Sequence, residues 1–538
     1  MRSVFKSFIV NNISLPYDAS FEEAFSVTLR IFRKEGVVLS NPELSIFRKS
    51  IDARKKNDIK IVYSVLVSAE FDAAYVPRDK AKISPLVEEK PTVTFGSEKA
   101  APPVVVGAGP CGMFAALMLA ENGYSPVLFE RGGSVKERKA AVSKFLETRV
   151  LDTATNIQFG AGGAGTFSDG KLVTRINDPF TTYVLKTLVK YGAPSEILYL
   201  AKPHVGTDVL SVVVDNILND IERLGGKVLY NTSVTGFKGE GKITSVITDK
   251  GELECGGVIL AVGHSARDTY SMLMERQVEL CAKDFSVGLR IEHPTEVIDR
   301  GMYGDCAGHK NLGHGEYTLS YNTKIRGVYT FCMCPGGEVV AATSEEGGVV
   351  VNGMSNYRRD GENSNCAVCC SVFKNDFDGT VNGAIEFQRN IERAAFVVGG
   401  KDYSAPIITV GDFLKGECKT SPDKVIPTYM GGKGVRLAPA DSYLPGFVCD
   451  GIRGAILDFD RKIKGFAMSE AVLTGPETRT SAPVRILRDN STRVSSAFSN
   501  LYPAGEGAGY AGGITSAAID GLRCAIAYMA RYCPNMHG

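Results

Sequence analysis

Hydrophobic and polar positions change period most clearly where an apolar run gives way to a helical repeat. Residues 104–106 are three consecutive valines, which is typical of a buried parallel strand. Apolar side chains then recur with the spacing of one helix face from Met113 to Ala120, and Gly123 ends that helix. Residues 126–129 form a second apolar run. The pattern therefore predicts a strand, a turn, a helix and a second strand in succession.

The pattern also predicts a small α+β domain ahead of this unit, over residues 1–76. Residues 21–33 have helical spacing after a polar cap and stand among strand-like runs. The expected strands cover residues 5–10, 44–48 and 59–67. A split β-α-β arrangement of the ferredoxin-like kind fits this order. Residues 77–101 mix prolines with alternating charges, which predicts a linker or an extended wrapping segment.

After residue 130 the pattern predicts an α/β fold with an inserted domain. A helix at 209–224 leads to a strand at 227–230, a meander over 234–248 and a buried strand at 257–263. Short strand-like runs and glycine turns then indicate an inserted, mainly β or α+β substrate domain over 280–462. We therefore expect a Rossmann-like nucleotide-binding domain built from residues 102–279 and 463–538.

Three glycines follow the first strand with the spacing G-x-G-x-x-G. Gly107 allows the tight turn, Gly109 lets the backbone approach a pyrophosphate, and Gly112 lets the helix pack closely on the strand. The helix start offers N–H groups and a partial positive charge to that pyrophosphate. Glu130 ends the second strand, where a carboxylate accepts ribose hydroxyls and would repel a 2′-phosphate. Together these features predict a dinucleotide site.

A second glycine-rich stretch runs from Asn156 to Lys171. Gly160, Gly162 and Gly165 repeat the spacing, but no apolar strand precedes them and no helical pattern follows. The stretch therefore predicts a loop whose N–H groups lie against a flat ligand, with Lys171 near the polar rim of that ligand. A purely structural Ω-like loop is the alternative.

Arginines and small residues beside these motifs are further candidates. Arg131 and Arg138 would bind the adenylate end of the ligand or simply solvate a helix start. The strand at 257–263 ends in Ala261 and Gly263, which lets backbone pass close to a nucleotide, and Arg267 follows shortly after.

The last glycine-rich element indicates which nucleotide is bound. Gly505 and Glu506 follow a strand, Gly512 and Gly513 come next, and a helix of small residues begins at Ile514. A ligand with a ribityl chain and a ring system needs such a second element, whereas NAD alone does not. The carboxylate can accept a ribityl hydroxyl. The helix start can stabilise negative charge on a reduced flavin by about 0.3–2 kcal/mol, which is a shift of tens of millivolts. FAD is the predicted cofactor.

The composition narrows the classes of protein to which the chain could belong. A length of 538 residues suggests several domains, and 44% hydrophobic with 22% charged residues is typical of a soluble globular protein. A net charge of +1 gives no reason to expect nucleic acid or an anionic membrane as the main partner. The 13 cysteines follow no framework spacing, and neither a secretory signal nor a long apolar run is visible. We therefore expect a cytoplasmic protein with reduced thiols.

Two clusters leave weaker alternatives open. Cys332-Met-Cys334 and residues 366–370 invite metal or dithiol interpretations, but His309 and His314 are too isolated to complete a zinc site. No metal is expected, and buried thiols are favoured over a redox pair. Basic residues at 48–56 indicate RNA, an acidic partner or, as we favour, a solvated loop.

The motifs together resemble the two-dinucleotide-binding-motif flavoproteins, the glutathione-reductase-like FAD fold. More narrowly, the chain resembles a family of FAD-dependent dehydrogenases of unassigned substrate, through residues 159–171, 331–337, 353–356 and 477–485 and the C-terminal glycines. The resemblance implies FAD contacts at Gly107, Gly109, Gly112, Glu130, Arg131, Val234 (backbone to adenine), Gly263, Glu506, Gly512, Gly513 and Ile514. Many such flavoproteins have Asp where this chain has Glu506. The motifs themselves add Pro110, Cys111, Arg138, Gly165, Lys171, Ala261, Arg267 and Gly505.

The predicted function is that of an FAD-dependent, dehydrogenase-like oxidoreductase, which transfers hydride or electrons between a non-covalently bound FAD and an unidentified small molecule. Because no second strand, G-x-G-x-x-G and helix unit follows residue 280, NAD(P)H would act as a transient electron donor. A flavin-dependent monooxygenase and a non-catalytic FAD-binding or RNA-associated protein are the alternatives. Lys171, His264 and Arg479 are candidates for an acid or base, and none is assigned.

Overall fold

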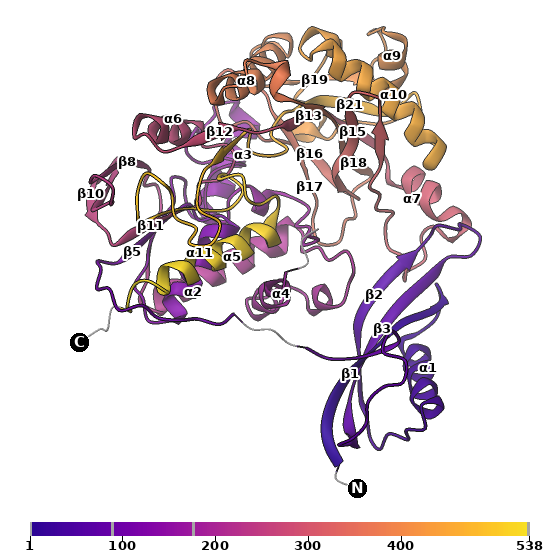
Figure 1. Cartoon of the computed structure of the whole chain (residues 1–538). Coiled ribbons are helices and arrows are strands. Elements are labelled where there is room, and N and C mark those ends of the chain that lie inside the picture. The colour runs from indigo at the N-terminus through magenta and orange to yellow at the C-terminus, as the bar shows by residue number, and fades with distance from the viewer. Residues whose placement is uncertain (1–2, 88–90, 175–177, 535–538) are drawn as a thin grey trace.

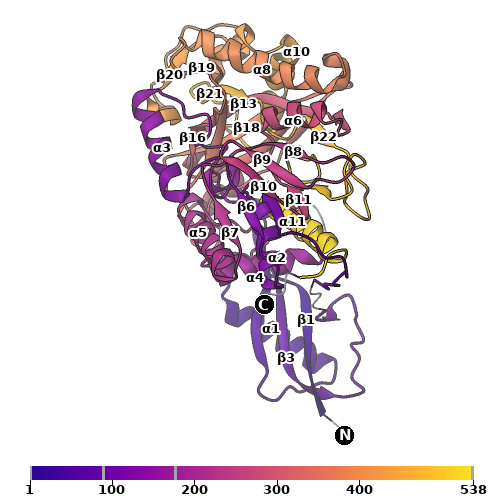
Figure 2. The same ribbon diagram turned by 90° about the vertical axis from the view of Figure 1, so that its left-hand side faces the viewer.

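The computed structural model describes residues 3–87, 91–174 and 178–534. An N-terminal unit projects from a larger body, and the two views in Figures 1 and 2 agree on this arrangement. The body contains parallel and antiparallel sheets together with helices, which confirms the predicted α/β class. Residues 88–90 of the predicted linker lie outside the described residues. Among the described residues, no helix combines the length and the apolar character that a membrane span requires.

The N-terminal unit is a four-stranded antiparallel sheet in the order β2-β3-β1-β4, packed against one helix. Its elements are β1 Ser3–Pro16, α1 Phe21–Lys34, β2 Glu43–Asp52, β3 Lys60–Asp72 and β4 Ile83–Pro85. The Ser20 hydroxyl caps α1 by accepting from the Glu23 N–H at 3.3 Å. Because β3 lies between β1 and β2, the chain makes a split β-α-β connection. β4 falls within the predicted linker, so this sheet continues past residue 76.

The rest of the predicted linker wraps along the end of the C-terminal helix, α11 (Ile514–Met529). The Gly96 N–H donates to the Met529 carbonyl at 2.8 Å, and the Cys533 N–H donates to the Glu98 carbonyl at 2.9 Å. A side chain at residue 96 is excluded, because its Cβ would lie 2.0 Å from the Arg531 carbonyl oxygen. The segment therefore ties the start of the body to its last residues.

Five parallel strands form the sheet of the body, in the order β23-β11-β5-β6-β7. Their bounds are β5 Pro103–Val106, β6 Val127–Phe129, β7 Lys227–Leu229, β11 Gly257–Leu260 and β23 Leu501–Pro503. The strand order reverses between β5 and β11. In open parallel sheets, ligands bind beyond the carboxyl ends of the strands at such a reversal.

Helices and a meander complete this part of the body. The bounds are α2 Pro110–Glu121, α3 Val135–Thr148, α4 Phe180–Lys190, α5 Thr207–Arg223, α6 Arg267–Glu275, β8 Val234–Lys238, β9 Ser245–Thr248 and β10 Gly251–Glu254. Residues Cys111 to Ala120 of α2 are all buried, because the helix packs among α5, α11 and the sheet. At Gly521 a Cβ would lie 2.0 Å from the Cys111 carbonyl oxygen, so α2 and α11 are in backbone contact.

A seven-stranded sheet in the order β14-β15-β18-β13-β21-β19-β20 forms the centre of the second half of the body. Its strands are β13 Phe285–Pro294, β14 Ser320–Asn322, β15 Gly327–Cys334, β18 Asn363–Val372, β19 Ala405–Thr409, β20 Val435–Leu437 and β21 Val472–Glu477. Around it lie α7 Thr295–Tyr303, α8 Val381–Val398, α9 Val410–Lys415 and α10 Gly446–Lys462. Two pairs of strands complete it: β16 Glu338–Ala341 with β17 Val351–Met354, and β12 Leu280–Ala282 with β22 Val484–Ile486.

One expectation for this half is corrected. The sheet does not stop at residue 462, because β21 pairs with β13 and β19 and lies well inside it. Of the two predicted alternatives, mainly β or α+β, the structure has the second, since α8 and α10 are long helices whose apolar faces pack into the same core as the sheet. Hereafter "the insertion" means residues 280–480.

Buried charges join the insertion to the part of the body that carries the parallel sheet. Glu392 on α8 accepts two hydrogen bonds from Arg267 at the start of α6, at 2.8 and 2.9 Å. It accepts two more from Arg479, at 2.9 and 3.1 Å. All three side chains are almost fully buried, and the two guanidinium groups hold the pKa of Glu392 far below its usual range despite burial.

We expect Glu392→Gln to lower the free energy of unfolding by about 3 kcal/mol, because it leaves two buried cations with too little negative charge. Urea unfolding followed by tyrosine fluorescence measures this, since the chain contains no Trp. The control is Glu386→Gln on the same helix, where the side chain is 45% exposed and the change should stay within about 0.5 kcal/mol. Equal effects of the two variants would contradict the central role of Glu392.

Candidate functional site

The first glycine turn leaves β5 at the reversal of strand order. Gly107 has φ +100°, and a Cβ there would lie 2.4 Å from the Ala261 carbonyl oxygen at the end of β11. Gly109 is the N-cap of α2 and makes no side-chain cap, and Gly163 Cα, 3.8 Å away, is the described atom nearest to where its Cβ would stand. The first turn of α2 therefore presents backbone N–H groups to an open space, as an anion site requires.

Glu130 joins this turn to the second glycine-rich loop. Its Oε2 accepts from the Ala108 N–H at 2.8 Å, and its Oε1 accepts from the N–H groups of Gly132 and Gly160 at 3.0 and 2.9 Å. A carboxylate has about four lone-pair sites. Three are used, so one remains on Oε2 for a hydroxyl of a bound ribose.

Arg138 does not reach toward a ligand, which corrects its predicted adenylate contact. The side chain is fully buried. Its donors hold the carbonyls of the loop, at 2.7 to 2.8 Å, from Asn156, Ile157, Ala161 and Gly163. Four of the five N–H groups of the guanidinium group are thereby used, so this residue fixes the shape of the loop.

The C-terminal glycines reach the same space from the opposite side. Gly513 has φ +99° and is the N-cap of α11, again without a side-chain cap. Gly512 and Gly513 are exposed. Among the described residues, no atom lies within 4 Å of the position that a Cβ would take at either glycine. At Gly165 a Cβ would lie 3.1 Å from Ile514, and Thr515 Oγ1 donates to the Leu172 carbonyl at 2.8 Å. The loop therefore lies against the starts of both α2 and α11.

Glu506 stands just before α11 and is partly exposed although it lies deep in the fold. Burial raises the pKa of its carboxyl to about 7, while the Gly513 N–H and the charge of Lys283 act in the opposite direction. Buried carboxyl groups are normally hydrogen-bonded, because an unpaired polar group away from water is costly in free energy. The residues fit FAD: two uncapped helix starts, bare glycines and two carboxyls surround one space.

Lys171 belongs to a cluster of charges beside this space. Its Nζ lies 2.8 Å from Asp169 Oδ2 and 3.4 Å from Glu316 Oε1. Arg359 binds the same two carboxylates, with its Nε 2.9 Å from Asp169 Oδ1. The sequence indicated Lys171 but gave no signal for Glu316 or Arg359, which are far away along the chain and belong to no motif.

Of the remaining predicted residues, some are held in contacts within the protein and others are partly exposed. Arg267 and Arg479 are both bound to Glu392. Their guanidinium groups are therefore engaged within the protein and are not free for the ligand contacts that the sequence suggested. His264 is partly exposed, and burial together with Arg479 and Arg267 lowers its pKa to about 4, so it is neutral near pH 7. Arg131 lies 4.4 Å above the Phe159 ring and pairs with Asp268 at 3.0 Å.

The other candidates lie at or near the strand ends that surround the space. Ala261 and Gly263 follow β11, Val234 is the first residue of β8, and Gly505 follows β23. Pro110, Cys111 and Gly112 form the first turn of α2. Cys111 itself is buried, and burial, together with the nearby Asp520 and Cys524, raises the pKa of its thiol well above the usual range.

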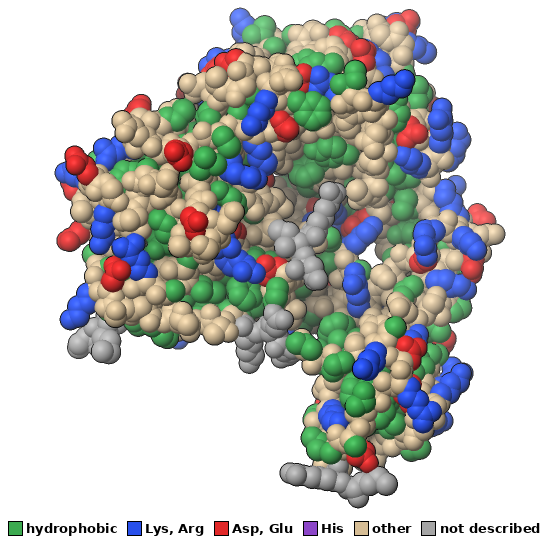
Figure 3. Space-filling view, in the orientation of Figure 1, with side chains coloured by type: hydrophobic (Ala, Val, Ile, Leu, Met, Phe, Trp, Pro, Cys, Tyr) green, Lys and Arg blue, Asp and Glu red, His purple; other side chains and the backbone are tan. Residues whose placement is uncertain are grey.

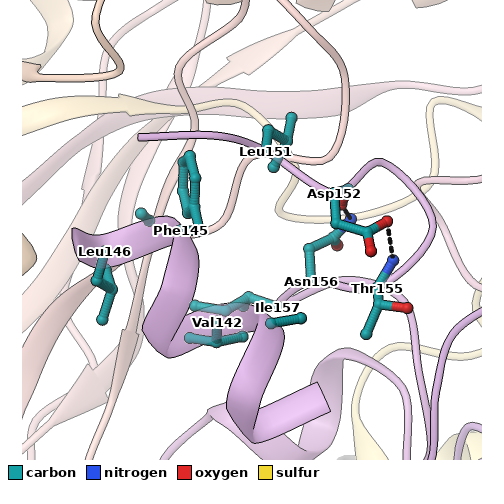
Figure 4. A pocket seen from close by; sticks show the side chains of 10 residues that line it. Val142, Phe145, Leu146, Leu151, Asp152, Thr155, Asn156 and Ile157 are labelled. Atoms are coloured by element: carbon teal, nitrogen blue, oxygen red, sulfur yellow. Dashed lines mark hydrogen bonds between the residues drawn. The ribbon is translucent and has the colours of Figure 1, made fainter. Parts of the chain in front are cut away.

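The surface is hollowed where the part that carries α11 faces the insertion, and Lys and Arg side chains lie along the rim (Figure 3). A separate pocket lies between α3 and the start of the glycine-rich loop (Figure 4). Phe145, Leu151 and Ile157 line it, and Asp152 accepts from the Thr155 N–H at 3.0 Å. Its cavity volume of about 10 Å³ is far below the ~300–1,000 Å³ of typical ligand sites. Among the described residues, no group of three or more potential metal ligands comes together.

Comparison with known proteins places the chain in a family. An uncharacterized protein of Clostridium beijerinckii is 46% identical over 525 residues, which cover 96% of this chain and 97% of that protein. The chain belongs to the same family as that protein. Residues 284–480 match the family described as FAD-dependent protein, C-terminal domain-like, and residues 9–68 match a domain of unknown function, DUF8436. The match over residues 284–480 supports an FAD-dependent flavoprotein.

Solved structures resemble the chain only distantly. The L-amino acid deaminase of Proteus myxofaciens in complex with anthranilate is 10% identical, with a TM-score of 0.35, over 84% of this chain and 96% of its own. CtdE in complex with FAD is 11% identical, with a TM-score of 0.32, over 79% of this chain and 82% of its own. At such low sequence identities and TM-scores, neither the substrate nor the reaction of these proteins can be assigned to this chain.

We expect FAD to bind more tightly as the pH rises through about 7, because the ionised Glu506 carboxylate is the stronger acceptor for a ribityl hydroxyl. At about pH 8 the Glu506→Gln variant should bind FAD roughly tenfold more weakly than the parent. At about pH 6 the difference should shrink, because the parent carboxyl is itself mostly protonated. Titrating the ligand-free protein with FAD and following flavin fluorescence measures the affinity.

The matched control is Glu254→Gln, an exposed acid on β10. It should leave the pH profile of FAD binding unchanged. A parent affinity that is flat between pH 6 and 8 would contradict the proposed contact.

Proposed function

We propose that the protein is an FAD-dependent oxidoreductase with a glutathione-reductase-like FAD fold, and that it transfers hydride or electrons between a non-covalently bound FAD and a small molecule. One observation carries the proposal. The uncapped starts of α2 and α11 face the same space from opposite sides, and Glu130 and Glu506 stand beside them. The family match over residues 284–480 supports the cofactor.

In this proposal each element binds one part of the cofactor. The N–H groups at the start of α2 hold the pyrophosphate, and the remaining lone pair of Glu130 accepts from a ribose hydroxyl. Glu506 accepts from the ribityl chain, and the N–H groups at the start of α11 lie at the edge of the ring system. When bound, FAD supplies two-electron redox chemistry. The chain positions it and adjusts its potential through the charge at α11.

The insertion supplies the substrate wall in this proposal. Its hairpin β16–β17 packs on the glycine-rich loop, where Val340, Val350 and Met354 contact Ile157 and Phe167. Asp169 in the loop is bound by Arg359 of the insertion. A substrate would thus meet the flavin between the loop and the insertion. NAD(P)H, as a transient donor, would have to enter the same space.

The test of the cofactor site is Gly512→Leu. A leucine there should abolish yellow colour on purification and weaken FAD binding more than roughly tenfold, because it fills the space proposed for the ring edge. The control is Gly446→Leu at the start of α10. Both glycines have open space beside them among the described residues, and neither has a positive φ. The proposal fails if the parent protein stays colourless with excess FAD, or if both variants retain it.

The electron donor is tested separately on the yellow parent protein. We expect anaerobic addition of NADH or NADPH to bleach the flavin absorbance, in line with transient nicotinamide binding. Bleaching by dithionite but by neither nucleotide would leave the FAD site intact and remove NAD(P)H as the donor.

A further inference from the structure

Cys332 and Cys334 lie at an irregular position of β15. The pairing of β15 with β18 shifts register between Phe331 and Cys334, so this is a β-bulge. Cys332 adopts φ +45°, a left-handed conformation that non-glycine residues rarely adopt. Such outliers gather at functional sites, where the surrounding structure holds them. Cys332 is partly exposed and Cys334 is buried.

Arg290 of β13 contacts the backbone of this bulge. Its guanidinium group is fully buried and binds both oxygens of Glu477, at 2.7 and 2.9 Å. One nitrogen also donates to the Cys332 carbonyl at 3.0 Å and lies 3.9 Å from Cys334 Sγ. A permanent cation therefore stands beside the pair, which is the setting that makes a thiol reactive.

The two thiols differ as an attacking and a resolving cysteine differ. The interaction with the Cys334 side chain, together with the charge of Arg290, lowers the pKa of Cys332 to about 7 in spite of burial. The same interaction and burial raise the pKa of Cys334 well above its usual range. Near neutral pH, Cys332 is partly a thiolate and Cys334 remains a thiol.

The pair faces the proposed flavin site. Ionised Cys332 raises the pKa of Glu506, and Lys171 lowers the pKa of Cys332, so the thiol lies within charge-interaction range of both groups. Glu506 precedes α11, and Lys171 adjoins Leu172, whose carbonyl accepts from Thr515 in the first turn of α11. Cys332 therefore lies near the side of the proposed site that Glu506 and Lys171 occupy.

We propose, resting on the FAD site proposed above, that Cys332 and Cys334 form a redox-active dithiol that exchanges two electrons with the flavin. On oxidation both S–H bonds break and one Sγ–Sγ bond forms. The two electrons and one proton pass to the oxidised flavin, and the second proton passes to solvent. The protein then stores two electron pairs per chain, and its substrate class includes compounds that exchange electrons with thiols.

The experiment is an anaerobic dithionite titration of the yellow protein after air oxidation, with the flavin spectrum as readout. The parent protein should take up about four electrons per FAD, two for the flavin and two for the disulfide. Cys332→Ser and Cys334→Ser should each take up about two. The control Cys418→Ser, which removes another partly exposed thiol, should still take up about four.

A chemical readout complements the titration. Trypsin releases residues 327–358 as one peptide whose only cysteines are Cys332 and Cys334. After oxidation with diamide this peptide should resist alkylation and weigh two hydrogen atoms less than its reduced form. Uptake of only two electrons by the parent, with both thiols still alkylated after oxidation, overturns the dithiol and leaves the FAD site standing. A protein that binds no FAD overturns both, and its lack of flavin absorbance identifies that case.

Discussion

Backbone contact without side chains is the constraint on which the site depends. At Gly107 the turn after β5 passes so close to β11 that a Cβ would lie 2.4 Å from the Ala261 carbonyl oxygen. At Gly112 a Cβ would lie 1.8 Å from the Gly107 carbonyl oxygen. Only glycine allows the start of α2 to come this close to the strand ends. The N–H groups of α2 and α11 can therefore face one shared space, and the polar residues act on whatever occupies it.

Buried ion pairs then fix the position of the insertion relative to that space. Glu392 binds both Arg267, in the part of the body that carries the parallel sheet, and Arg479 at the end of the insertion. Asp169 of the glycine-rich loop accepts a hydrogen bond from Arg359 of the insertion. Such ion pairs contribute little net stability compared with apolar packing, but their geometry is exacting. They are suited to holding the insertion in one position over the loop, which a purely apolar interface would do less selectively.

Local patterns explain what the sequence predicted well. The valine run, the glycine spacing and the acid at residue 130 all lie within one strand-turn-helix-strand unit, and that unit is present as expected. Arg138 was misjudged because its partners are backbone carbonyls, which leave no mark in the sequence. Helix α10 was missed because Gly446, Gly451 and Gly454 obscure its apolar face. Glu392 and Arg359 were missed because ion pairs between distant segments have no local spacing.

Glu506 and Cys332 bring these levels together, because segments far apart in the sequence place both groups in one poorly solvated part of the fold. Burial raises the pKa of the Glu506 carboxyl, and the charge of Cys332 adds to that rise. The Gly513 N–H and the charge of Lys283 act on the carboxyl in the opposite direction, while Cys334, Arg290 and Lys171 lower the pKa of Cys332. The donors and cations that the fold gathers here therefore favour negative charge on both residues against the cost of burial.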